Sequence, residues 1–145
     1  MRFGRKGVID LPVKLMVVVL ILSLSVPVLA GAMEHGEANN ATSAMNCEID
    51  RMFNAAAAVH YSGIGSSRTV SISLPDGCEI EIPGGGGAGS YSVKTMYKGD
   101  QTSVRYMDRP PVRFITDGLV ISGSCMLLIT GDVADGDHAV KVEIV

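Results

Sequence analysis

The sequence contains no tryptophan, and only four tyrosines and three phenylalanines among its 145 residues. Aromatic cages for cations and stacking platforms for single-stranded nucleic acid need more aromatic side chains than this. Charged residues are also scarce, at 19%, and the net charge is −3. From Met33 onward there are 8 basic and 14 acidic residues, so the phosphates of a nucleic acid would be repelled. We therefore expect no nucleic-acid partner.

Sequence signatures of catalysis are absent as well. A chain of 145 residues is too short for a large barrel or a two-domain cofactor enzyme. It contains no G-x-S-x-G motif and no paired acids in a catalytic frame. The run Gly84–Gly89 has the spacing G-x-G-x-x-G, but a strand is predicted after it, where a dinucleotide site needs a helix. We expect neither enzymatic activity nor a cofactor.

The charges at the N-terminal end are distributed unevenly. Residues 1–14 hold four basic residues against one acid, and residues 15–33 hold no charge. A helix of this apolar length spans about 28 Å, close to the hydrocarbon core of a bilayer at about 30 Å. The positive-inside rule places residues 1–14 in the cytoplasm and the chain after Glu34 outside. We therefore expect a basic leader at 1–14 and a transmembrane helix at 15–33, in a single-pass membrane protein.

Three fates of this segment are consistent with the sequence. It is a removable signal peptide if cleavage follows Ala32, because Ala30-Gly31-Ala32 has the small-x-small pattern of such sites. It is a plain anchor if no cleavage occurs. In the third fate, only the residues before Val8 are removed and the helix is retained.

The third fate rests on a resemblance. Arg5-Lys6-Gly7-Val8-Ile9, followed by a long hydrophobic helix, resembles the class III signal of archaeal type IV pilin-like proteins, over roughly residues 5–60. In that family a prepilin peptidase cuts after the glycine, and the retained helix forms the packing core of a filament. The resemblance thus implies processing between Gly7 and Val8. The sequence differs from the bacterial pattern in having Pro12 where glutamate is usual, with Asp10 as the acid nearby.

An amphipathic helix is predicted over residues 34–62. Its apolar stripe recurs at helical spacing and consists of Ala38, Met45, Ile49, Met52, Ala56 and Val59. Ser62-Gly63 supplies the C-terminal stop. We expect the stripe to pack against a β-sheet that follows it. Asn40-Ala41-Thr42 is an N-glycosylation sequon, which makes Asn40 a candidate modification site.

Beyond Gly65 the apolar pattern changes to period two, which is typical of strands. The expected strands are 69–74, 78–82, 91–97, 103–107, 112–115, 119–122, 126–130 and 139–145. Turns are predicted at Pro75-Asp76-Gly77, where a hairpin would close, at 98–101 and at 131–137. The expected fold class is α+β: a long N-terminal helix packed on a small antiparallel sheet, with residues 63–145 as an exported β-rich head.

The three cysteines would all lie on the exported side, where disulfides form. Cys47, Cys78 and Cys125 lack the C-x-x-C spacing of zinc and redox sites. We predict a disulfide between Cys78 and Cys125, at the starts of two strands. Pairing of Cys47 with Cys78 is the alternative.

Metal binding has one candidate. Asp132, Asp135 and Asp137 cluster in a glycine-containing turn and could ligate calcium, although their spacing is not that of an EF-hand. Solvated turn carboxylates are the simpler interpretation. The three histidines are scattered along the sequence without the spacing of a metal site.

The sequence thus predicts a non-enzymatic protein of the cell envelope. It is either a membrane-anchored or filament-forming pilin-like subunit, or a solitary anchored or secreted binding domain cut after Ala32. The first hypothesis implies the membrane, copies of the chain or related pilin-like subunits, and a prepilin peptidase as partners.

Overall fold

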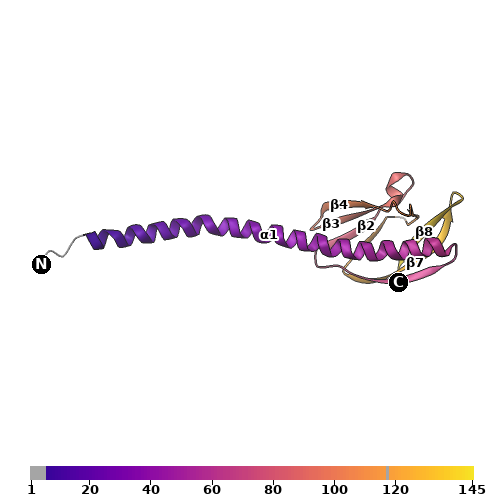
Figure 1. The fold of residues 1–145 in the computed structure, drawn as a ribbon, viewed down its shortest axis with the longest axis horizontal. Helices are drawn as coiled ribbons and strands as arrows, with labels where there is room; N and C mark the ends of the chain where they lie inside the picture. The colour runs from indigo at the N-terminus through magenta and orange to yellow at the C-terminus, as the bar shows by residue number, and fades with distance from the viewer. Residues whose placement is uncertain (1–5, 117) are drawn as a thin grey trace. The chain divides into compact units, whose positions relative to one another are not determined.

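The computed structural model describes the backbone of residues 6–116 and 118–145, and side chains from Leu11 onward, Asp117 excepted. Helix α1 (Lys6–Ser62) is followed by eight strands in the described residues (Figure 1). The chain divides into two compact units, Met1–Ala38 and Asn39–Val145. Helix α1 crosses this boundary, and its two parts are described in turn.

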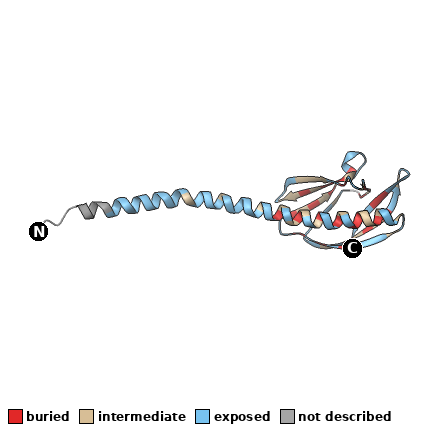
Figure 2. Ribbon diagram, viewed as in Figure 1, coloured by how far each residue is buried: buried red, intermediate tan, exposed pale blue. Residues whose placement is uncertain are grey.

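The part of α1 in the first unit consists mostly of apolar residues. It stays helical although it contains two prolines, Pro12 and Pro27. Proline removes one backbone N–H donor from a helix, a change that is better tolerated in membrane helices than in soluble ones. From Leu11 to Ala38 almost every residue is exposed, drawn pale blue in Figure 2. No core therefore forms within the described residues of this unit.

The second unit, Asn39–Val145, contains the end of α1 and two four-stranded sheets. From here on, the head means this whole unit. The first sheet has the order β1 (Ser67–Ser73), β7 (Ser124–Ala134), β8 (Asp137–Ile144), β5 (Arg113–Phe114). The second has the order β4 (Asp100–Tyr106), β3 (Ser92–Tyr97), β2 (Cys78–Ile82), β6 (Leu119–Ser122). A short 3₁₀ helix, η1 (Ala88–Tyr91), precedes β3.

The core of the head lies between α1 and both sheets, so the α+β prediction is confirmed. The predicted stripe is buried at Met45, Ile49, Met52, Ala56 and Val59. The inward-facing strand residues complete one continuous cluster, and the largest of them are Ile72, Ile80, Ile82, Phe114, Ile121, Leu127 and Ile129. Burial of this apolar surface is the main stabilising contribution to the head.

The strand pairing differs from the prediction in two respects. The expected single antiparallel sheet is two sheets, and β5 pairs with β8 in parallel. Pro75-Asp76-Gly77 closes no hairpin, because β1 pairs with β7 whereas β2 pairs with β3 and β6. This turn carries the chain from one sheet to the other. Period two identifies a strand and its buried face, but it does not identify the neighbouring strand.

Two other turns form hairpins within the ranges that the sequence predicted. Lys98 and Gly99 both have positive φ, at 51° and 87°, and join β3 to β4 as expected. The turn predicted over 131–137 is shorter, because β7 continues to Ala134 and only Asp135 and Gly136 reverse the chain, with φ of 54° and 87°. The long β7–β8 hairpin therefore ends in an acidic tip, which we define as residues 132–137.

Candidate functional site

The apolar part of α1 is the most conspicuous functional feature. Among the described residues, one helix is long and apolar enough to cross a membrane, and it lies near the N-terminus. The large apolar side chains from Leu11 to Met33 are each between 52% and 71% exposed. An exposed hydrophobic surface of this length needs a lipid or protein environment.

The serines in this apolar segment are compatible with such an environment. Ser23 Oγ donates a hydrogen bond to the carbonyl oxygen of Val19, and Ser25 Oγ donates one to that of Ile21, both at 2.7 Å. A hydroxyl that is bonded within its own helix avoids the cost of an unpaired polar group in hydrocarbon. The two serines therefore do not prevent membrane insertion.

The predicted processing residues all lie on α1. Gly7 and Val8 are near its first residue, and only their helical backbone belongs to the described part of the structure. Ala30 and Ala32, the alternative signal cleavage site, are helical and exposed. Asn40 of the sequon is also helical and exposed.

The cysteines are separate in the structure. Cys47, Cys78 and Cys125 are all free thiols, so the structure does not contain the disulfide predicted between Cys78 and Cys125, or the alternative with Cys47. Cys78 begins β2 and Cys125 is in β7, which belong to different sheets. Burial, and secondarily the charge of Asp76, raises the pKa of the Cys78 thiol, and burial also raises the pKa of Cys125.

At the acidic tip, the structure does not gather Asp132, Asp135 and Asp137, the calcium candidates of the sequence, into one cluster of ligands. The described residues contain no group of three or more His, Cys, Asp or Glu side chains that could hold a metal ion. Asp135 Oδ2 accepts a 2.8 Å hydrogen bond from Arg113 Nη1, which raises the pKa of the guanidinium. Asp132 Oδ1 accepts a 2.8 Å bond from the backbone N–H of Val133. These carboxylates are thus directed to separate partners and to solvent.

The structure brings together two histidines that sequence reasoning treated as isolated. The rings of His60, in the last turn of α1, and His138, in β8, are 5.7 Å apart and nearly perpendicular. His60 Nδ1 is buried without a hydrogen-bond partner among the described residues. The separation of these residues along the chain left no local motif to predict the contact.

On one flank of α1, Arg105 of β4 fixes the helix to the second sheet. Its guanidinium makes a 2.7 Å ion pair with Asp50 and donates a 3.2 Å hydrogen bond to the carbonyl oxygen of Asn46. It also lies over the ring of Phe53, with 5.6 Å between the guanidinium carbon and the ring centroid. These contacts hold the helix in one register on the sheet.

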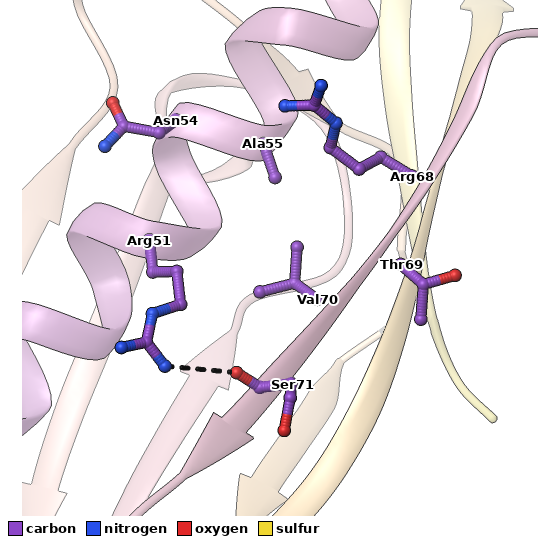
Figure 3. Close-up of a pocket in the computed structure, with 7 residues that line it drawn as sticks. All are labelled: Arg51, Asn54, Ala55, Arg68, Thr69, Val70 and Ser71. Carbon is purple, nitrogen blue, oxygen red and sulfur yellow. Dashed lines mark hydrogen bonds between the residues drawn. The ribbon is translucent and has the colours of Figure 1, made fainter.

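On the other flank, α1 and β1 enclose a groove of about 430 Å³ (Figure 3). We call it the β1 groove, and it is lined by Arg51, Asn54, Ala55, Arg68, Thr69, Val70 and Ser71. Ala55 and Val70 face each other across its apolar floor, and the two arginines lie at either side. No motif predicted this groove, because its two walls come from elements that are separated in the sequence by the α1–β1 connection.

The chain matches no protein-family model, no curated protein and no solved structure at a significant level.

The architecture is nevertheless recognisable in outline. A long apolar N-terminal helix, whose later part packs against β-sheets through Met45, Ile49 and Met52, is a pilin-like architecture. The apolar helix can serve as a membrane anchor or as a signal sequence.

Proposed function

We propose that this protein is a structural subunit of the cell envelope. Its apolar helix inserts in the membrane and packs against the same helix of other copies, as in pilin-like assemblies, and the head lies outside. The observation that carries the proposal is the exposed apolar surface of the uncharged stretch from Leu15 to Met33, on a helix that continues into the core of the head. In lipid, such helices associate through side-chain packing.

The proposed route to the mature subunit is cleavage between Gly7 and Val8 by a prepilin peptidase. The support is the Lys6-Gly7 pair at the start of α1, ahead of the apolar run, together with the basic residues of the leader. Removal of residues 1–7 would take away three of the four positive charges that oppose translocation and leave the helix intact. The role is structural, without catalysis.

A second candidate function is favoured by one observation. The buried apolar core begins at Ala41, and none of its residues comes from the described residues before it. The head would therefore keep its core if a signal peptidase cut after Ala32. The product would be a secreted binding domain rather than an assembling subunit.

Cross-linking in the native membrane tests the assembly. A photoreactive p-benzoylphenylalanine at position 22, replacing Leu22 in the middle of the exposed apolar surface, should produce a ladder of covalent oligomers of this chain on illumination. Specific packing predicts that the yield persists when the membranes are fused with a tenfold excess of lipid. A yield that falls in proportion to the dilution, or cross-links to lipid alone, would contradict the proposal.

A further inference from the structure

Strand β1 forms a free edge of its sheet, because its ladder partner is β7 and it ends the strand order. The carbonyl oxygen of Ser71 points away from β7 and accepts a 3.4 Å hydrogen bond from Arg51 Nη1. In an antiparallel strand, the N–H and C=O of one residue point to the same side, and the side alternates along the chain. Thr69 and Ser71 therefore present their backbone groups to the β1 groove.

The sides of the groove carry positive charge. Arg51 uses Nη1 both for Ser71 and for a 3.3 Å contact with Glu48, and its side chain is 60% exposed. Arg68 makes no ion pair with a described residue, and it flanks the groove on the opposite side (Figure 3). Two guanidinium groups and an exposed strand edge together suit a carboxylate-bearing segment.

The head itself carries such a segment at the acidic tip, at the far end of the β7–β8 hairpin (Figure 1). Asp132 and Asp137 are exposed, and neither lies within ion-pair distance of a described cation, whereas Asp135 is bonded to Arg113. Within the same head, the charge of Asp132 acts on Lys141 and that of Asp137 on Arg113, at longer range. Within one copy, the pairing of Ser67 with Thr130 places the tip beyond the start of β1, so it does not enter its own groove.

We propose that the β1 groove of one copy binds the acidic tip of a second copy, with Arg51 and Arg68 paired to Asp132 and Asp137. This inference rests on the proposed function, since it assigns the contact between heads in the assembly. The two contact surfaces are different patches of the chain, so the interface is heterologous. A heterologous interface that does not close into a ring extends into a filament, and charge complementarity would select the register of the subunits.

The test uses the full chain in its membrane, with p-benzoylphenylalanine at position 54, on the groove side of α1. We expect cross-links to the cyanogen bromide fragment that contains the acidic tip, residues 127–145, whose bounds are the same in every variant because cleavage occurs at methionine. The groove reversal R51E/R68E and the tip reversal D132K/D137K should each reduce this cross-link at least tenfold. Combining all four substitutions in one chain should restore it, because the reversed charges attract again.

The matched control is D76K/D100K, which makes the same charge change at two exposed acids of the head, one in the β1–β2 turn and one at the start of β4, and should leave the cross-link unchanged. A cross-link to another peptide, or one that is insensitive to R51E/R68E, would overturn the inference. Cross-linking from position 22 distinguishes failure of this inference from failure of the proposed function. If helices cross-link and the groove does not reach the tip, only this inference fails. If neither cross-link forms, both fail.

Discussion

At the scale of single residues, Gly131 has the least room for a side chain among the described glycines compared in the head. It lies in β7 opposite the end of α1, and a Cβ built there would be 2.7 Å from the carbonyl oxygen of Gly63 and 3.3 Å from Val59 Cγ1. Its backbone N–H donates to Ser66 and its carbonyl accepts from Gly65, both at under 3 Å. A methyl group would therefore displace backbone atoms that are fixed by two hydrogen bonds.

We predict that Gly131→Ala lowers the free energy of unfolding of the head by about 1–3 kcal/mol, as over-packing does in other cores. Chemical unfolding of the full chain in detergent, followed by circular dichroism, measures the loss. Gly86→Ala is the control, because a Cβ there meets no atom within 4 Å. Equal stability of the two variants would show that the α1–β7 approach is looser than described.

The thiols give a second residue-scale prediction. Raised pKa values reduce the thiolate fraction of Cys78 and Cys125 at pH 8, and the thiolate is the species that reacts with iodoacetamide. Exposed Cys47 should therefore be alkylated first and buried Cys78 last, by at least tenfold in rate, with the slow rates increasing as the pH rises. Mass spectrometry after denaturation without reductant should find three modified thiols. Modification of Cys47 alone would instead show that Cys78 and Cys125 are joined, and modification of Cys125 alone would show that Cys47 and Cys78 are joined.

At the scale of elements, the register of α1 on the second sheet depends on Arg105. Its three contacts, to Asp50, to the Asn46 carbonyl and to the Phe53 ring, are all made by one planar group. We predict that Arg105→Ala destabilises the head by about 1–2 kcal/mol, the sum of a partly exposed ion pair, a hydrogen bond and a cation–π contact. Lys141→Ala removes a surface pair with Glu143 and should change stability by less than about 0.5 kcal/mol. The account is contradicted if the two variants are equally stable.

The apolar part of α1 gives the second prediction at this scale. Leu22→Arg places a charge at the centre of the segment, which costs about 2.5–3.5 kcal/mol of insertion free energy. We expect a fall of at least tenfold in the carbonate-resistant membrane fraction. Ile64→Arg, at an exposed apolar residue of the head, should leave the membrane fraction unchanged. Equal retention of both variants would mean that the helix does not anchor the chain.

How far the sequence determines these elements depends on how local the information is. The stripe from Met45 to Val59 was predictable, because helical periodicity depends on neighbours three and four residues apart. The existence of two sheets was not, since Pro75-Asp76-Gly77 has the same turn chemistry whether or not its flanking strands pair. The β1 groove was also not predictable, because Arg51 and Arg68 come to line the same groove only once α1 has packed beside β1.

At the scale of the whole molecule, the two units need different environments. The head has a continuous core of its own, from Ala41 to Val142. The residues from Leu11 to Met33 contribute no buried side chain and require lipid or other helices. The proposed function follows from this division, because an anchor kept on a folded head positions copies side by side in the membrane, where the β1 groove and acidic tip can meet.

The mature N-terminus tests the central claim most directly. Mass spectrometry of the protein isolated from its native membrane should find a chain that starts at Val8, with the apolar helix intact. A start at Met33 would contradict the account, since the helix would have been removed as a signal peptide and the head released. A start at Met1 would contradict the processing step and leave a plain membrane anchor.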